Sequence, residues 1–311
     1  MSVHLQNAEL IRAEISSQLA HVRTLLARPL HRIEAQSIGG GPLHPLQEVL
    51  EAAERWVRRD DLATAHVEGY VVEATGLGPL ITARSGDPAL PGLLADMVGP
   101  DQYLHAVGVL GVAFAMQSLA PSTQVRLLRK TTQAPGYIAD IRVTLPDSTT
   151  FDIEAKAPRI LRGLRRTIRT KLARRAVTNA VSGACDPVRG QLPKTSPGVV
   201  AIASFGLGEA SFAALVRAAN RQLEVHRAEN PLLMGVLIVD YRRAAKILSS
   251  TKRKGPGDSW SQTSRVSLTW GSHRELVRNP GYRGEPRVVI VDGHEPAKDY
   301  FDFSSAEAAP D

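Results

Sequence analysis

Two uninterrupted apolar segments with a helical pattern between them constrain the fold of this chain most strongly. The segments are GVVAIASF at residues 198–205 and MGVLIVDY at residues 234–241, and the helical pattern covers residues 208–228. Apolar runs of this length, without alternating polar residues, are typical of strands that are buried on both faces. The pattern therefore predicts an α/β protein in which helices cover the faces of a sheet.

The order of the preceding segments extends this prediction. They are a helix at about 101–119, strands at 124–129, 136–145 and 150–157, and a basic helix at about 160–182. From residue 101 to residue 241 the predicted order is αβββαβαβ, which indicates a mixed central sheet.

The rest of the chain consists of an N-terminal part and a C-terminal part. Pro and Gly cluster in SGDPALPG at 85–92, and the segment before it is helical apart from a short strand-like piece, GYVVEA, at 69–74. A chain of 311 residues is long for one compact domain. We therefore predict a helical N-terminal region at 1–95, a core at 96–245 and a C-terminal extension at 246–311 with the strands SRVSLTW and RVVIVDGH.

The composition limits the partners and the compartment. A net charge of +7 at pH 7 favours a polyanionic partner. Cys185 is the single cysteine, which excludes a disulfide framework and a multi-cysteine zinc site and fits a reducing cytosol. The longest apolar run, residues 107–116, is too short to cross a bilayer, and residues 1–15 lack a continuous apolar region. We therefore expect a cytoplasmic protein without a secretion signal or a membrane partner.

Charged residues interrupt the second and third predicted strands. Asp140 lies in the second strand, and Glu154 and Lys156 share one face of the third because side chains alternate along a strand. A turn centred on Asp147 would place Asp140 across from Glu154, on the same face of an antiparallel pair. Two facing carboxylates repel each other, so the pair needs a compensating charge.

Two interpretations of this arrangement are open from the spacing alone. In the first, a Mg²⁺ ion joins the two carboxylates, and waters and a phosphate oxygen complete its shell. Lys156 then orients or deprotonates an attacking water, or balances the charge on the phosphate in the transition state. In the second, the three groups are solvated charges on an exposed hairpin.

Asp140 and the sequence Glu154-Ala155-Lys156, separated by thirteen residues, resemble the signature of the PD-(D/E)XK nuclease superfamily, also called restriction-endonuclease-like. The predicted order of elements over about 100–242 is similar to the core of that superfamily. The resemblance implies a restriction-endonuclease-like αβββαβ core with a mixed central sheet, a helical N-terminal cap and a C-terminal extension. It also implies that Asp140, Glu154 and the carbonyl oxygen of Ala155 bind Mg²⁺, for which Mn²⁺ can substitute. The implied catalytic residues are Asp140, Glu154 and Lys156.

The chain departs from the superfamily pattern at two places. Ala139 stands where the Pro of the name is expected, which is a common replacement. Many members supply a further acid from the first core helix, but residues 101–119 contain only Asp101, at the edge. Candidates for this role in the cap are Glu51, Glu54 and Glu68, and the number of metal ions stays open.

The predicted basic helix follows the motif directly. Its apolar stripe is Leu161, Leu164, Ile168, Leu172 and Ala176, and residues 160–182 contain no acid. Several Lys and Arg side chains beside a metal site predict sequence-independent contacts with phosphates. The residues predicted to bind nucleic acid are Arg162, Arg165, Arg166, Arg169, Lys171, Arg175 and, from the following loop, Gln191. For Gln191, which could also hold the attacking water, a loop-capping role is open as well.

The sequence therefore predicts a Mg²⁺-dependent nuclease that hydrolyses phosphodiester bonds, in DNA first and in RNA second, in bacterial defence or DNA repair. The alternative is a catalytically inactive nuclease-fold protein that binds nucleic acid or acts as a scaffold. A homodimer is left open.

Overall fold

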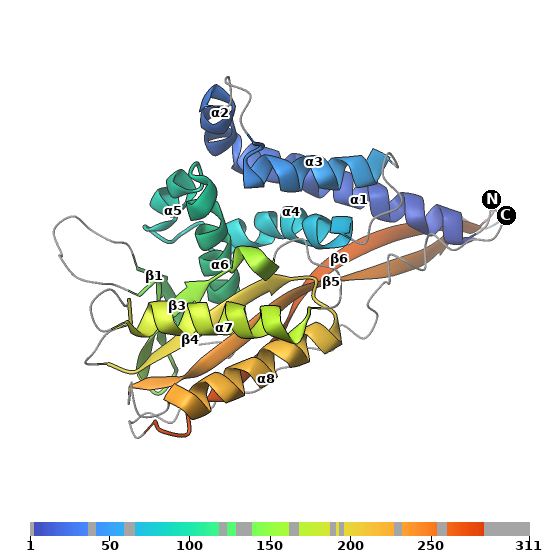
Figure 1. Cartoon of the computed structure of the whole chain (residues 1–311). Helices are drawn as coiled ribbons and strands as arrows, with labels where there is room; N and C mark the ends of the chain where they lie inside the picture. The colour runs from blue at the N-terminus through green and yellow to red at the C-terminus, as the bar shows by residue number, and fades with distance from the viewer. Residues whose placement is uncertain are drawn as a thin grey trace.

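The computed structural model describes ten segments of the chain. They are residues 3–36, 42–58, 66–117, 123–128, 139–161, 168–186, 191–192, 196–226, 232–253 and 260–282. Within these segments a six-stranded sheet lies between two layers of helices (Figure 1).

The strands follow one another in the sheet in chain order, from β1 to β6. Their bounds are β1 Gln124–Leu127, β2 Ile141–Thr144, β3 Thr150–Lys156, β4 Gly198–Phe205, β5 Leu233–Arg253 and β6 Trp260–Arg278. β3, β4 and β5 run parallel, and the other neighbouring pairs are antiparallel. The prediction of an α/β protein with a mixed sheet is thus confirmed.

The position of β4 explains why its sequence lacks polar alternation. Val199, Ala201 and Ala203 pack into the hydrophobic core on one face of the sheet. Val200 and Ile202 pack into the core on the other face. All of these side chains are at most 2% exposed. A strand whose two faces are both covered needs apolar residues at successive positions.

Helices cover both faces of the sheet. The first face carries α1 Val3–Leu25, α2 Ala27–Gln36, α3 Pro45–Arg58, α4 His66–Thr82, α5 Leu90–Asp96 and α6 Pro100–Gln117, whose buried residues share one core. The second face carries α7 Thr170–Cys185 and α8 Glu209–His226. In the described segments, no helix combines the length and the apolar content needed to cross a membrane.

Helix α6 lies close to the sheet because two of its residues lack side chains. A Cβ atom added to Gly108 would lie 3.0 Å from the Cβ of Ala157, directly after β3. A Cβ atom added to Gly111 would lie 2.8 Å from the Cε2 of Tyr241 on β5. The Tyr241 hydroxyl also donates a hydrogen bond to the carbonyl oxygen of Gly111. The two glycines therefore set the distance between α6 and the sheet.

Residues 69–74, predicted as a short strand, form part of helix α4 instead. Val71 and Val72 favour strands in isolation, but residues 71–78 are all buried in this helix. Intrinsic propensity is a weak preference, and the burial of an apolar segment overrides it. The strand predicted at this place was therefore wrong.

The basic helix begins later than predicted. α7 starts at Thr170, and Arg159–Leu161 form a single 3₁₀ turn in which Leu161 N–H donates to the carbonyl oxygen of Pro158 (2.8 Å). Pro158 favours an extended backbone before it, so the chain leaves β3 without entering a helix directly. Residues 162–167, with Arg162, Leu164, Arg165 and Arg166, lie outside the described segments.

The predicted division into three regions stays a prediction. The described parts of residues 1–95 are largely helical, but their buried side chains share a core with α6 and the sheet. The boundary predicted between residues 245 and 246 falls inside β5, which pairs with β6 as far as Arg253↔Trp260. The predicted strand at 264–270 lies within β6, and the one at 287–294 lies outside the described segments.

Candidate active site

The β2–β3 hairpin has the predicted register. Ile141 pairs with Ile153 and Arg142 pairs with Asp152, which centres the turn on Asp147. The Arg142 guanidinium donates two hydrogen bonds to the Asp152 carboxylate, from Nε (2.8 Å) and from Nη2 (3.0 Å). The charge of Asp152 is therefore balanced within the hairpin by a bidentate pair.

Asp140 directly precedes β2 and lies against β3. Its N–H donates to the carbonyl oxygen of Ile153 (3.0 Å), and its Oδ2 accepts a hydrogen bond from the N–H of Ala155 (2.9 Å). Asp140 is 6% exposed and Glu154 is 0% exposed. The interpretation of these acids as solvated charges on an exposed hairpin is therefore wrong.

Glu154 is a buried acid with an unusual pKa. Burial raises the pKa of Glu154 to about 8, the charge of Asp140 acts in the same direction, and Lys156 opposes both effects. Its Oε1 accepts a hydrogen bond from Nζ of Lys156. Its Oε2 is buried and has no hydrogen-bond partner in the described part of the chain. A buried oxygen without a donor is costly, which makes this atom a candidate cation ligand.

Two acceptors hold the amine of Lys156. Nζ donates to Oε1 of Glu154 and to Oε1 of Gln191, the second over 2.9 Å. Gln191 was predicted to contact a phosphate or the attacking water, and the structure gives it the Lys156 amine as a partner. Its contact with a phosphate stays a prediction. In the structure this amide accepts a hydrogen bond from the amine.

A histidine that was not predicted from the sequence completes the group. Nε2 of His105, on α6, lies 3.1 Å from Oδ1 of Asp140. Burial lowers the pKa of His105, but the hydrogen bond to Asp140 and the charges of Asp140 and Glu154 outweigh burial, so the pKa is raised. One signal was present: His105 is the last polar residue before the apolar stretch 106–116 of a helix predicted to face the sheet.

The sequence suggested that an acid of the N-terminal cap is a further metal ligand, but the described candidates do not lie beside Asp140. Glu51 is exposed on α3, and Glu54 pairs with Nε of Arg23 (2.7 Å). No described contact links either acid to Asp140. The side chain of Glu68 lies outside the described residues.

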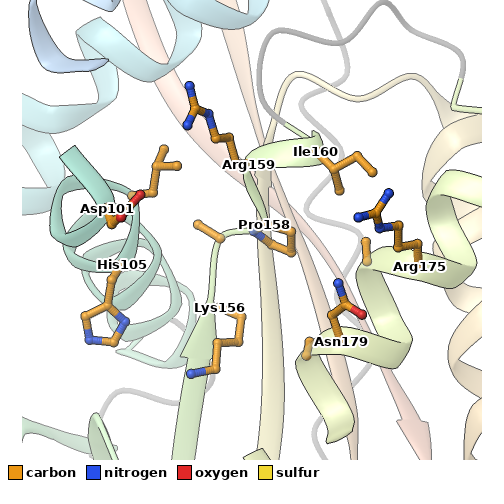
Figure 2. A pocket seen from close by; sticks show the side chains of 12 residues that line it. Asp101, His105, Lys156, Pro158, Arg159, Ile160, Arg175 and Asn179 are labelled. Carbon is orange, nitrogen blue, oxygen red and sulfur yellow. The ribbon is translucent and has the colours of Figure 1, made fainter. Parts of the chain in front are cut away.

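A cavity of about 610 Å³ opens beside Lys156, between α6 and α7 (Figure 2). Its walls are Asp101, Leu104 and His105 on α6, residues 156–160 at the end of β3 and in the 3₁₀ turn, and Arg175, Ala176, Asn179 and Ala180 on α7. Figure 2 shows Arg175 and Asn179 reaching from α7 toward the strand end, with Asp101 and His105 on the opposite side. Of the clustered side chains, His105 and Lys156 therefore line the space between the two helices.

The described part of the predicted nucleic-acid surface lies on and just before α7. Arg175 lines the cavity, and Arg169 and Lys171 are exposed near the start of the helix. Ala176 and Ile168 are buried, as predicted for the apolar stripe.

The donor set at Asp140 and Glu154 fits Mg²⁺. The two carboxylates and the carbonyl group of Ala155 offer oxygen atoms, and Mg²⁺ is commonly held by one or two carboxylates with waters or phosphates in the remaining positions. Among the described residues, no group of three or more His, Cys, Asp or Glu side chains is arranged to hold a metal ion. A cation here would therefore depend on water or substrate oxygens for the rest of its shell.

No protein-family model, curated protein or solved structure matches this chain. Its function is therefore inferred from the geometry around Asp140, Glu154 and Lys156.

Proposed function

We propose that this chain is a Mg²⁺-dependent nuclease that hydrolyses phosphodiester bonds in DNA. The proposal is carried by the buried Asp140–Glu154 pair, with the Lys156 amine bonded to Glu154 beside a cavity that Arg159 and Arg175 line. The strand order and the β2–β3 register support a restriction-endonuclease-like core. They bring the two acids and the lysine of the PD-(D/E)XK pattern to one place.

The residues that would hold Mg²⁺ are Asp140, Glu154 and the carbonyl of Ala155. The buried Oε2 of Glu154, which lacks a described hydrogen-bond partner, fits this role. When bound, the ion supplies Lewis-acid activation of the phosphate and lowers the pKa of a water. Because the pKa of Glu154 is about 8, its carboxyl must lose a proton before it can serve as a ligand at neutral pH.

Lys156 is the residue that acts on the attacking water. An ammonium group has three donors, and two of them reach Glu154 and Gln191. The third N–H is available for a water or a phosphate oxygen. Because Gln191 fixes the amine from one side, Lys156 is oriented before a substrate arrives.

The Asp140 carboxylate is fixed from two sides. Nε2 of His105 contacts Oδ1, and the N–H of Ala155 donates to Oδ2. Such partners orient a carboxylate, and they reduce the reorganisation needed when a charged ligand binds. His105 is therefore a positioning residue for Asp140.

A nucleic-acid-binding or scaffold protein without turnover is the second candidate. One observation favours it: no third metal-ligating side chain joins the acidic pair among the described residues. The exposed basic residues of α7 would bind phosphates without any reaction.

The test is cleavage of labelled DNA and RNA by the full-length chain in Mg²⁺, in Mn²⁺ and in EDTA. We expect products with either ion, none in EDTA, and losses of at least about a hundredfold in Glu154→Ala and Lys156→Ala. Glu51→Ala is the matched control, because Glu51 is an exposed acid of α3 without a described contact to the site. Thermal denaturation followed by circular dichroism checks that each variant is folded.

Two outcomes decide between the candidates. Wild-type cleavage by the Glu154→Ala variant would refute the assignment of the site. Salt-sensitive binding without a product, for every substrate and ion, would favour the second candidate.

A further inference from the structure

The last two strands of the sheet continue well beyond the other four. β4 ends at Phe205, which pairs with Tyr241, whereas β5 continues to Arg253. The pairing of β5 with β6 runs without a shift in register as far as Arg253↔Trp260. Figure 1 shows the extension as two long strands that lie side by side past the rest of the sheet. The segments 242–253 and 260–271 are called the β5–β6 arm below.

The arm begins at the edge of the sheet where the candidate site lies. β3, β4 and β5 are parallel, so their carboxyl ends share this edge. Lys156, the last residue of β3, pairs with Ile202, and Ile202 pairs with Ile238, shortly before the arm starts. At about 3.3 Å per residue, the arm is about 36 Å long. One strand of duplex DNA carries a phosphate about every 3.4 Å, so the arm can accompany about ten phosphates.

The arm is basic, and one of its faces carries most of the charge. Residues 242–253 and 260–271 contain several Lys and Arg residues and no acid. Successive residues of a strand alternate between the faces, and residues paired across antiparallel strands share a face. The register therefore places four cations together with Ser and Thr residues on one face, called the basic face below. The cations are Arg242, Lys246, Lys252 and Arg265.

The opposite face of the arm is apolar in its middle. The pairs Ala245↔Leu268 and Ile247↔Val266 lie on it. Where the arm starts, this face continues the side of Tyr241, which belongs to the core beneath α1–α6. Helix α1 also contacts β6. Antiparallel strands commonly pack one face on a core and leave the other for solvent or a ligand. The basic face is therefore the one suited to a charged ligand.

The basic face starts on the side of the sheet that carries Glu154. Glu154 pairs with Val200 and Val200 pairs with Val236, and Arg242 has the same alternation as Val236 along β5. On this side, helix α8 joins the end of β4 to the start of the parallel strand β5. It therefore runs back along the sheet, away from the arm. A polyanion that extends from the site past this edge meets the basic face.

Resting on the proposed function, in which the substrate is DNA, we propose that the basic face of the β5–β6 arm binds the DNA backbone beside the site of cleavage. Arg242, Lys246, Lys252 and Arg265 neutralise phosphates, and the Ser and Thr hydroxyls donate hydrogen bonds to phosphate oxygens. These contacts hold the substrate independently of its base sequence.

Binding measured without cleavage tests this inference. Fluorescence anisotropy of the full-length chain in EDTA uses a labelled single strand of about 40 nucleotides and the matching duplex, over a series of KCl concentrations. Variants are compared on the form that wild type binds more tightly. Lys246→Ala combined with Arg265→Ala removes two cations that are diagonal neighbours on the basic face. We expect about tenfold weaker binding, and a log–log salt slope reduced by about 1.4 for a single strand or about 1.8 for a duplex.

Arg243→Ala combined with Arg253→Ala is the matched control. This variant also loses two cations of the arm, but from the opposite face, so its net charge changes equally. We expect its affinity to stay within about threefold of wild type, because charges that do not touch the DNA are screened by salt. An equal loss in the two alanine variants, or no binding of either DNA form by wild type, would overturn the inference.

A second variant separates lost charge from a disturbed arm. Lys246→Arg combined with Arg265→Lys keeps both charges, so its affinity and salt slope should stay close to those of wild type. A loss as large as in the alanine variant of the same two residues would show that the arm was disturbed and would contradict phosphate binding by these charges.

The binding assay also separates this inference from the proposed function. It contains no divalent ion, so the contribution of the arm can be measured whether or not the protein cleaves DNA. Loss of binding specific to the basic face, without cleavage by wild type in Mg²⁺, would contradict the nuclease and leave the arm assignment standing. Cleavage by the Lys246→Ala, Arg265→Ala variant with the KM of wild type would contradict the arm assignment alone.

Discussion

The amine of Lys156 and the carboxyl group of Glu154, two residues apart on β3, form a hydrogen-bonded pair although Glu154 is completely buried. The Lys156 amine does not bring the pKa of Glu154 back to its ordinary value, because burial and the charge of Asp140 keep it near 8. Without a cation and at neutral pH, this carboxyl therefore holds a proton. A cation that binds at Oε2 must displace the proton.

Without divalent ions, the free energy of unfolding should decrease as the pH rises from about 5 to about 8. Glu154 titrates near 4.5 when unfolded and near 8 when folded, so the folded state binds the extra proton in this range. While the folded state keeps this proton and the unfolded state has lost it, stability falls by up to about 1.4 kcal/mol per pH unit, and the decrease ends above about pH 8. Urea unfolding in EDTA at several pH values measures this slope.

Glu154→Gln is the comparison for that slope. The variant keeps the shape of the side chain but cannot titrate, so its unfolding free energy should lack this decrease and exceed that of wild type above about pH 8. All other titrating groups are shared by the two proteins. Parallel stability curves for the two proteins would show that Glu154 titrates near its ordinary value.

Mg²⁺ should raise the melting temperature, and more strongly at high than at low pH. Binding to the folded state alone stabilises it, and below about pH 8 the affinity should fall by up to about tenfold per pH unit because Glu154 must first lose its proton. Thermal denaturation with and without MgCl₂ on both sides of this pH gives the shifts. Asp140→Asn removes one carboxylate and should lose most of the effect. An equal shift in that variant would place the bound ion elsewhere.

His105 should titrate above its ordinary value of 6.5, because its contact with Asp140 favours the protonated ring. NMR titration of the imidazole signals measures this pKa directly. In Asp140→Asn the pKa should fall, since burial then acts without the main opposing charge. The exposed His31 on α2 is the internal reference, because its signals should not change between the two proteins. A His105 titration unchanged by Asp140→Asn would contradict the described contact.

Gln191→Ala should lower kcat about tenfold and change KM less than about twofold. The reason is the hydrogen bond from Nζ of Lys156 to Oε1 of Gln191, which positions the amine without touching the substrate. Steady-state cleavage kinetics separate the two parameters. The opposite pattern, a raised KM with an unchanged kcat, would show that Gln191 binds a phosphate, as the sequence predicted.

The central strands of the sheet could be predicted from the sequence because their signals are local, but the length of the β5–β6 pair was not predicted. The unbroken apolar runs of β4 and β5 reflect burial on both faces, and the turn around Asp147 fixes the β2–β3 register. Once this register is set, Asp140 must lie beside the Glu154 end of β3. The acidic pair and Lys156 could therefore be predicted without coordinates.

Other features depend on contacts between distant parts of the chain. His105 meets Asp140 because α6 packs on the sheet, and no spacing in the sequence encodes that meeting. The helical state of residues 69–74 depends on burial that comes from neighbouring elements. The paired state of Glu54 depends in the same way on Arg23 of α1. Local patterns cannot carry this information, since the partners are far apart in the chain.

The two glycines of α6 that lie against the sheet, Gly108 and Gly111, also affect the position of His105 in the candidate site. His105 lies on the same helix as Gly108 and Gly111. The position of its imidazole therefore depends on how closely α6 packs against Ala157 and Tyr241. A methyl group at Gly108 would lie 3.0 Å from the Cβ of Ala157, so either Ala157 or α6, with His105 on it, would have to shift. The position of the titratable side chain of His105 thus depends on a glycine one turn further along the helix.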